Sequence, residues 1–384
     1  MYDAIVIGTG GVGSAAAFHL ARRGAKVLGL DRFPGGHDRG SSHGETRIIR
    51  QAYFEHPDYV PLLKRAYELW GELEQEAGEN LFHQVGLIQI GPEHGPVVHG
   101  VLESAQLHQL AVEKLTAEEI GRRWSAFRIP EGMIGAYESS AGYLRVEACV
   151  LAHLESAELY GAEFKSGVAV KRWREDGDGV CVATDQGEFH AAKLVITAGP
   201  WAPQILADLG IRLEVRRKHL YWLGTSDTAL DQARCPTFLY EMPQGVFYGF
   251  PAIDALGVKV AEHSGGAVVG DPLNDPRQLD ERDLSRAKEF LAQCMPTVTG
   301  PLNRHAVCFY TMSPDEHFLV DLHPQSGRVV FAAGLSGHGF KFTSVLGEAL
   351  AEMALEGRTS LPVGFLNCGR FIPPPLASPP ASGR

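Results

Sequence analysis

The alternation of apolar and polar positions at the start of the chain predicts a strand, a helix and a second strand. Residues 4–7 and 26–30 form short apolar runs, and residues 14–23 between them have the pattern of a helix. A glycine-rich turn separates the first run from this helix. A further helix is predicted over residues 59–76, because apolar side chains recur there at spacings of three and four positions and so share one face.

The remaining pattern predicts a few more helices separated by many strands. Helical spacing recurs over residues 97–110, 116–124, 146–159 and 281–294. Strand character is expected over residues 81–90, 163–174, 179–184, 187–190, 193–199 and most of 213–308. The last unit resembles the first, with a strand over residues 329–333, a glycine-rich turn over 334–339 and a helix over 343–355. The predicted fold class is therefore α/β.

Length, charge and cysteine usage narrow the classes of protein. A chain of 384 residues favours two lobes. Its 35 Lys and Arg against 46 Asp and Glu leave a net charge of −11, which argues against nucleic acid as the main partner. The six cysteines include no CxxC pair, so we expect neither a metal site nor a disulfide framework. We also expect no leader segment and no membrane partner, and hence a cytoplasmic protein.

The first glycine-rich turn has the spacing of a dinucleotide-binding motif. Gly8, Gly10 and Gly13 form GxGxxG directly after a strand and directly before a helix. In that context the first glycine allows a tight turn, the second lets the backbone approach a pyrophosphate, and the third brings the helix close to the strand. The phosphates would rest on the helix N-terminus. Asp31, at the end of the second strand, would accept hydrogen bonds from ribose hydroxyls.

The glycine motif alone does not distinguish NAD from FAD. A nicotinamide enzyme would continue its parallel sheet with further strand and helix units. Here strand-rich segments interrupt the sheet before it resumes near Gly199 and Gly334, and this interruption favours flavin. Residues 195–201, VITAGPW, also resemble the second FAD fingerprint of glutathione-reductase-like flavoproteins.

Two clusters of basic residues carry possible chemistry, and each has a plain structural alternative. Arg47 and Arg50 are three positions apart, so on a helix they would share a face and could bind one anion. On composition alone, a solvated basic turn is the simpler interpretation of this pair. Lys259 lies between two valines and either points to solvent or lines a pocket, with solvent the default.

Two later clusters are equally open when the residues are taken alone. Cys308 lies in an apolar segment, where a cysteine ordinarily serves only to pack. His338 lies among the glycines of residues 334–339, and Lys341 follows them just before a predicted helix. Such a backbone can approach a planar ligand closely, and the helix dipole there would favour negative charge.

Taken together, four motifs resemble the monomeric sarcosine oxidase and N-methyltryptophan oxidase family of FAD amine oxidases. They are GSSHGETRIIR, YGFP with the later KVAEH, AVCFYTMSPDEHFLVD and AAGLSGHGFKFTSVLGE, and the resemblance extends over residues 2–371. It implies a glutathione-reductase-like FAD-binding Rossmann domain with a second, substrate domain that contains a mixed β-sheet. It further implies an oxidase whose substrates are a small N-alkyl amino acid and O2. It also implies that the protein is a monomer.

The activity that this resemblance implies is the oxidation of secondary amino acids, with sarcosine as the first expectation. N-methyl-L-tryptophan, pipecolate or another N-alkyl amino acid is the alternative within the family. A NAD-dependent imino or amino acid dehydrogenase and a non-catalytic flavin-binding protein are the alternatives from other classes. The first would turn over with NAD, and the second would need neither Lys259 nor Lys341.

The resemblance also assigns roles to individual residues. Cys308 would be joined to the 8α-methyl carbon of FAD, and Arg50 and Lys341 would bind the substrate carboxylate. Lys259 matches the family's oxygen-activating lysine. The residues that would line the flavin and substrate cavity are Tyr248, His263, Arg47 and Tyr310. The residues expected to contact FAD are Gly8, Gly10, Gly13, Asp31, Ser41, His43, Thr46, Val170, Ala198, Gly199, Trp201, Cys308, Gly334, Gly337, Gly339 and Lys341.

The expected domains are discontinuous along the chain. The FAD-binding domain would take residues 1–80, 141–212 and 305–371. The substrate domain would take residues 81–140 and 213–304. Residues 372–384 are rich in proline and are predicted to form an extended tail.

Overall fold

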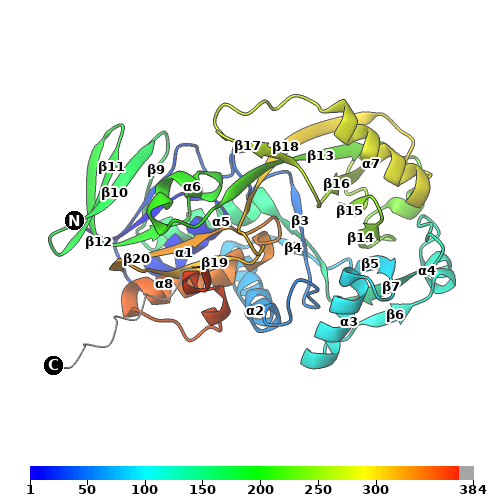
Figure 1. Cartoon of the computed structure of the whole chain (residues 1–384), viewed down its shortest axis with the longest axis horizontal. Helices are drawn as coiled ribbons and strands as arrows, with labels where there is room; N and C mark the ends of the chain where they lie inside the picture. The colour runs from blue at the N-terminus through cyan, green and yellow to red at the C-terminus, as the bar shows by residue number, and fades with distance from the viewer. Residues whose placement is uncertain (372–384) are drawn as a thin grey trace, which may run out of the picture.

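Eight strands form the sheet that carries the glycine motif (Figure 1). The structure is a computed structural model and describes residues 1–371, so the predicted Pro-rich tail lies outside the described residues. The parallel core of the sheet runs in the order β9 (Glu163–Lys165), β2 (Val27–Leu30), β1 (Tyr2–Ile7), β12 (Gly187–Ile196) and β20 (Ser326–Ala333). The antiparallel strands at its margins are β10 (Val170–Asp176), β11 (Gly179–Thr184) and β19 (Leu319–His323).

Hydrophobic side chains cover both faces of this sheet. Along β1, Ala4 and Val6 belong to one core and Ile5 and Ile7 to the other, as the two-residue period of a strand requires. The helices that pack around the first core are α1 (Gly11–Arg22), α2 (Tyr59–Ala77), α5 (Val146–Leu159) and α8 (Thr343–Glu356). The short α6 (Ala202–Ile205) contributes to the second core. Within residues 1–371, no helix has both the length and the apolar character needed to cross a membrane.

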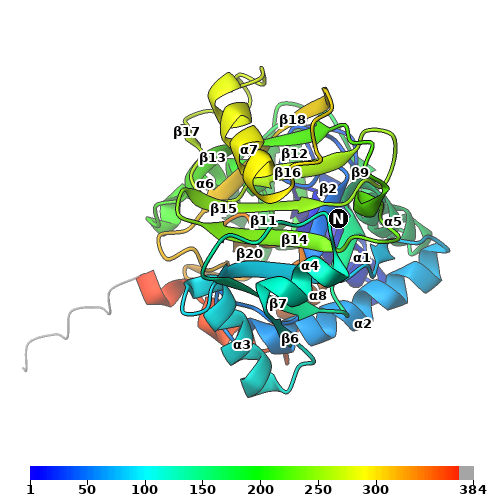
Figure 2. The same ribbon diagram turned by 90° about the vertical axis from the view of Figure 1, so that its right-hand side faces the viewer.

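A second sheet, of nine strands, forms the other lobe (Figure 2). Its strands are, in order, β17 (Ala267–Val269), β13 (Glu214–Leu223), β16 (Val258–Glu262), β15 (Gly245–Phe250), β14 (Thr237–Met242), β5 (Leu87–Pro92), β7 (Met133–Glu138) and β6 (Glu113–Leu115), with β18 (Leu302–Met312) paired to β13. Only the β14–β5 pair is parallel among these neighbours, so the predicted mixed sheet is confirmed. The helices packed against it are α3 (Pro96–His108), α4 (Ala117–Arg123) and α7 (Glu281–Cys294).

Arg47 lies in a strand, and Arg50 directly follows it, so this segment is not a helix. It forms β3 (Thr46–Ile49), which pairs with β8 (Gly142–Arg145), and β8 also pairs with β4 (Phe82–His83). The prediction that Arg47 and Arg50 share a helix face is therefore wrong. Three of the four residues of β3 are β-branched, and such residues favour the extended backbone.

The long strand β12 corrects a second prediction. The pattern predicts separate strands over residues 187–190 and 193–199, but one strand runs from Gly187 to Ile196. Ala191 pairs with Val180 of β11 on one side and with Tyr2 of β1 on the other, so the strand exchanges partners without a break. The predicted helices over residues 146–159 and 281–294 are confirmed with the same bounds.

Candidate functional site

The larger of two adjoining cavities lies at the carboxyl ends of the parallel strands. Ile7, Asp31, Thr197 and Gly334 line it where β1, β2, β12 and β20 end. This edge is where open α/β sheets bind their ligands. Many of the residues predicted to contact a cofactor line this cavity, namely Gly8, Gly10, Asp31, Ser41, Val170, Ala198, Gly199, Trp201, Gly334, Gly337 and Gly339.

The glycine motif performs the roles predicted for its first and third positions. Gly8 has a φ of +85°, and a Cβ atom there would lie 2.5 Å from the carbonyl oxygen of Thr197. A Cβ atom on Gly13 would lie 1.8 Å from the carbonyl oxygen of Gly8, so only glycine lets α1 start this close to β1. A Cβ atom on Gly10, by contrast, would have the Ser42 hydroxyl oxygen as its nearest neighbour, at 3.7 Å. The backbone at Gly10 is therefore open to the cavity.

The charges along this cavity fit a dinucleotide. The first turn of α1 contains no acidic residue, so its N-terminal N–H groups are suited to phosphate. At the end of β2, the Asp31 carboxylate accepts hydrogen bonds from the backbone N–H of Thr9 at 2.7 Å and of Phe33 at 2.9 Å. These two bonds fix an acceptor at the place where a ribose would lie. The described residues therefore fit FAD, for which Asp31 would bind the ribose and the α1 N-terminus the pyrophosphate.

A smaller cavity adjoins the first and shares part of its wall. Arg47, Tyr310, Gly337 and Phe340 line both cavities. The complete lining of the smaller cavity is Arg47, Ile48, Arg50, Phe54, Glu55, Leu239, Tyr248, His263, Tyr310, Gly337, His338, Phe340 and Lys341. The fold thus brings together six predicted site residues from distant segments of the chain, namely Arg47, Arg50, Tyr248, His263, Tyr310 and Lys341. Lys341 lines this smaller cavity and not the larger one.

Two buried cations face the smaller cavity. The Arg50 guanidinium lies between the rings of Tyr53 and Phe54, 4.5 Å and 4.7 Å from their centroids. The Lys341 ammonium donates hydrogen bonds to the His338 carbonyl oxygen at 2.6 Å and to the Tyr53 hydroxyl at 3.3 Å. Burial, reinforced by the nearby Arg50, lowers the pKa of Lys341. Both side chains are about as buried as core residues, so the charge of Arg50 acts on the cavity with little screening by water, and a bound carboxylate would favour the protonated form of Lys341.

Glu55 is the carboxylate that the sequence analysis missed. Nη2 of Arg50 donates to its two oxygens at 2.8 Å and 2.6 Å. Burial alone would raise the pKa of Glu55, but attraction by Arg50 and then by His338 and Lys341 outweighs it and lowers the pKa to about 2. Its main partner, Arg50, is only five positions away, but the pairing depends on how the loop between them folds, and no local pattern predicts it.

Three polar rings complete the smaller cavity. Nδ1 of His263 lies 3.4 Å from the Tyr310 hydroxyl, and the Tyr248 and His263 rings meet edge to face. Burial lowers the pKa of His263 to about 3, so this imidazole is neutral at neutral pH. Burial raises the pKa of Tyr310 and of Tyr248, so both phenols stay protonated. The wall therefore offers neutral hydrogen-bonding groups beside the two cations.

Lys259 neither points to solvent nor lines either cavity. Its ammonium is buried on β16 and donates to the carbonyl oxygens of Gly44 and Thr46 at 2.6 Å and 2.9 Å, and to the Thr46 hydroxyl at 3.0 Å. Burial, then the Arg47 cation, lowers its pKa. The solvent-exposed alternative is therefore wrong. Thr46 and His43, which were expected at the cofactor, are buried behind the lining instead.

The thiol of Cys308 lies directly behind the wall of the larger cavity. Arg47 donates a hydrogen bond to its Sγ atom at 3.2 Å, and Sγ lies 3.4 Å from the carbonyl oxygen of Ser41. Arg47 and Ser41 both line the cavity, whereas Cys308 is 1% exposed and does not. The sulfur is thus one side chain away from the cofactor space, among the residues of a hydrophobic cluster.

Comparison with known proteins gives the same family from sequence and from structure. The family described as FAD dependent oxidoreductase matches residues 3–353. The monomeric sarcosine oxidase of Streptomyces avermitilis is 42% identical over 386 residues, which cover 99% of each chain. The N-methyl-L-tryptophan oxidase of Salmonella dublin is 38% identical over 361 residues, covering 94% of this chain and 96% of that protein. The structure of NikD, an unusual amino acid oxidase essential for nikkomycin biosynthesis, has 27% sequence identity and a TM-score of 0.83, covering 95% and 97% of the two chains.

These matches agree with the cavity at the carboxyl ends of the strands and with its glycine-rich turns. The family match includes the glycine motif and the predicted carboxylate-binding residues, because both lie within residues 3–353. The chain belongs to the FAD dependent oxidoreductase family.

Proposed function

We propose that this protein is an FAD-dependent oxidase of secondary amino acids, with sarcosine as the first candidate substrate. The observation that carries the proposal is the smaller cavity, where two buried cations face a space that adjoins the FAD cavity. The relatives named sarcosine oxidase and N-methyl-L-tryptophan oxidase support an N-methyl amino acid as the substrate class. For sarcosine, the reaction with water and O2 yields glycine, formaldehyde and hydrogen peroxide.

Arg50 and Lys341 would bind the substrate through its carboxylate. A guanidinium offers paired donors to a carboxylate, and such charge-assisted bonds are stronger than neutral ones. Glu55 already supplies a carboxylate to Arg50, so a substrate would take over that interaction. Two fixed cations would also orient the rest of the substrate, which lowers the entropic cost of the reaction.

The surroundings of the cavity favour the neutral form of the substrate amine. Only the neutral nitrogen has the lone pair that oxidation of its neighbouring carbon requires. The cationic Arg47, Arg50 and Lys341 disfavour an additional positive charge in this space. Because the His263 imidazole is neutral, it can accept a hydrogen bond from the amine.

FAD, when bound, supplies the two-electron acceptor and passes the electrons on to O2. We propose that Cys308 attaches the cofactor covalently. This proposal is supported by the position of the thiol behind Ser41 and Arg47. Lys259 would assist the oxygen half-reaction as a positioning residue, because its hydrogen bonds to two backbone carbonyl oxygens and to the Thr46 hydroxyl hold residues 44–46 in place.

The choice between small and large substrates depends on the apolar part of the smaller cavity. Ile48, Phe54 and Leu239 line it and would contact the side chain of the amino acid. These three groups offer a substrate side chain apolar contact and no hydrogen bond, so we propose a substrate whose side chain is small or apolar. Sarcosine meets this condition, and N-methyl-L-tryptophan or pipecolate is the alternative.

An assay for hydrogen peroxide tests the proposed function. Purified protein is incubated in air with sarcosine, N-methyl-L-tryptophan, pipecolate and L-proline in turn. Peroxide from at least one N-alkyl or cyclic amino acid supports the proposal, and the rates rank the substrates. Reduction of NAD in the absence of peroxide would instead support a dehydrogenase. Failure of every amine to bleach the yellow colour without air would support a non-catalytic flavin-binding protein.

The domain division and the cellular setting are also proposals. The buried residues of the second lobe's hydrophobic cluster all lie within residues 88–298. The buried residues of the two clusters around the first sheet lie before residue 83 or after residue 143, and none lies within residues 213–304. This supports the two discontinuous domains expected from the sequence. The six cysteines are free, as a reducing cytoplasm would keep them. We propose a monomer, as in the name of the sarcosine oxidase relative.

A further inference from the structure

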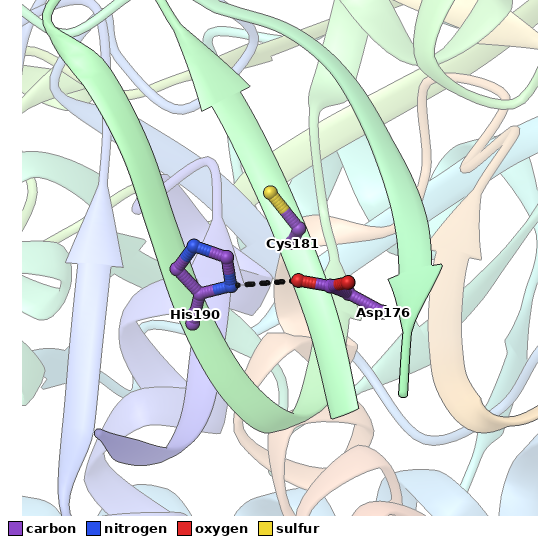
Figure 3. Close-up of side chains that lie close together, drawn as sticks. All are labelled: Asp176, Cys181 and His190. Atoms are coloured by element: carbon purple, nitrogen blue, oxygen red, sulfur yellow. Dashed lines mark ion pairs between the residues drawn. The ribbon is translucent and has the colours of Figure 1, made fainter. Parts of the chain in front are cut away.

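The antiparallel margin of the first sheet carries a cluster of donor atoms that the oxidase site does not use. It consists of Asp176 on β10, Cys181 on β11 and His190 on β12, which we name the Cys181 trio (Figure 3). None of the three residues lines the two cavities of the oxidase site. The strands β10 and β11 lie at the end of the first lobe that is remote from the second sheet (Figure 1).

The position of Cys181 is unusual among the cysteines of this chain. The other five, Cys149, Cys235, Cys294, Cys308 and Cys368, each belong to a hydrophobic cluster. Cys181 belongs to none, because its neighbours Val180 and Val182 turn into the core and the strand period turns Cys181 to the other face. A packing role, which accounts for the other thiols, does not account for this one.

Polar side chains surround the thiol on that outer face. Cys181 is directly opposite Arg174 on one neighbouring strand and His190 on the other. Their bulk leaves the thiol with no exposed surface although it lies outside the core. Arg174 is engaged by Glu188 through two hydrogen bonds, at 2.9 Å and 3.2 Å. The nearby positive charge is therefore already neutralised.

The three donor atoms are close enough to share one ion. The carboxylate oxygen of Asp176, the Sγ atom of Cys181 and a ring nitrogen of His190 all lie within 4.8 Å of one another. Nδ1 of His190 is 3.2 Å from Oδ2 of Asp176. In a tetrahedral zinc site with ordinary bond lengths, neighbouring ligand atoms are about 3.5 Å apart. Small side-chain rotations would bring the sulfur to that distance, because Asp176 and His190 are both exposed.

We propose that the Cys181 trio is a binding site for a borderline divalent cation, with Zn²⁺ as its reference ion. One sulfur, one nitrogen and one oxygen donor make a set that zinc accepts, and hard cations such as Mg²⁺ do not favour it. Water would occupy the fourth position, since the site is on the surface. Binding forms a metal–sulfur bond and releases the thiol proton to solvent. The ion would link the three strands at the margin of the sheet, where the short α6 packs against β10.

Calorimetric titration of the full-length, flavin-loaded protein with ZnCl2 tests the site, after chelator treatment and removal of the chelator. We expect one Zn²⁺ per chain, and binding about tenfold weaker or more in Asp176→Asn, Cys181→Ser and His190→Ala. Asp178→Asn is the matched control, because it removes a carboxylate from the same hairpin outside the trio. It should bind zinc like the unaltered protein, and MgCl2 should give no binding.

Two results would overturn the proposal. One is equal zinc affinity in the unaltered protein and in the three trio variants. The other is an equal loss in Asp176→Asn and Asp178→Asn, which would mean that surface charge alone attracts the ion. Flavin content and the far-ultraviolet circular dichroism spectrum establish that each variant is folded. If Cys181→Ser does not fold, Asp176→Asn and His190→Ala decide the question, because both positions are exposed.

Discussion

The carboxylate of Glu55 lies 2.6 Å from the guanidinium of Arg50, within the wall of the smaller cavity. Both groups are largely withdrawn from water, so each depends on the other for its charge balance. If the proposed function is correct, the substrate carboxylate must displace Glu55 from Arg50. The free enzyme thus already contains a carboxylate, that of Glu55, which is the same chemical group that the substrate would present to Arg50.

Replacing Glu55 by Gln should therefore increase the affinity for a carboxylate ligand. The variant leaves the Arg50 cation without its anion, and a bound carboxylate would restore it. We expect acetate, which is not oxidised, to bind about tenfold more tightly, the equivalent of one charge-assisted hydrogen bond. Titration followed through the visible absorption of the flavin measures this. Unchanged or weaker acetate binding would show that Glu55 does not compete for the carboxylate position.

Replacing Lys341 by Met should raise the KM for the amino acid. Loss of one charge-assisted bond to the carboxylate costs about 1.5–3 kcal/mol, or about 10-fold to 100-fold in kcat/KM. Flavin content should not change, because Lys341 lines only the smaller cavity. Lys288→Met, at an exposed position of α7, is the control, since it removes an equal charge from the surface. Steady-state rates by the peroxide assay provide the comparison, and an unaltered KM would exclude Lys341 from carboxylate binding.

Replacing Lys259 by Met should slow the half-reaction with O2 more than the half-reaction with the amine. The variant removes all three hydrogen bonds that hold residues 44–46 beside the cofactor. We expect a loss of about 10²-fold in the oxygen step, the size typical of a preorganised donor. Stopped-flow measurements with and without air separate the two steps. Lys218→Met is a matched control, because Lys218 is another buried lysine of the same sheet that donates to Ser264 instead. Equal losses in both steps would refute the assigned role.

Replacing Cys308 by Ser should leave FAD in the supernatant when the protein is precipitated with acid. The unaltered protein should give a yellow pellet, because the proposed thioether survives denaturation. Cys149→Ser, which changes a buried cysteine of the first core, should keep the colour in the pellet. Absorbance of the two fractions decides the outcome. A yellow pellet from Cys308→Ser would place the attachment elsewhere, and a colourless pellet from the unaltered protein would show that no attachment exists.

The stability of the protein should fall as the pH drops below about 6.5. Burial lowers the pKa of His19, His153 and His263 to about 3, so these rings are neutral in the folded chain. The unfolded chain binds their protons from about pH 6.5 downward, so unfolding takes up protons and acid favours it. Each ring contributes at most about 1.4 kcal/mol per pH unit between the two pKa values. Urea unfolding at pH 7 and pH 5 measures the slope. His153→Gln should reduce it, and an identical slope would contradict the assignment.

The sequence pattern located most of the first sheet because its strands are buried on both faces and read as apolar runs, as in residues 4–7. The smaller-cavity residues Tyr248, His263 and Lys341 were predictable only through the family resemblance. The pairing of Arg50 with Glu55 was not predictable, since it depends on how the loop after β3 folds. The spacing of three between Arg47 and Arg50 is typical of a helix face and does not reveal the strand at Arg47. The β-branched neighbours of Arg47 favour the extended backbone instead.

The Cys181 trio escaped the sequence analysis for a related reason. Metal sites are recognised in sequences when two ligands lie a few positions apart, as in CxxC. Here each ligand comes from a different strand, and only the pairing register brings Cys181 opposite His190. Register between strands is a property of the folded sheet, and spacing along the chain does not reveal it.

The short segment from Ser41 to Arg50 reaches the thiol at Cys308, the amine of Lys259 and the carboxylate of Glu55. Cofactor attachment, the reaction with O2 and substrate binding would accordingly all depend on this one segment. A distortion introduced at any of these points should propagate to the others, so engineers who seek a new substrate preference have good reason to leave this segment intact and to alter Leu239, which lines the smaller cavity from β14.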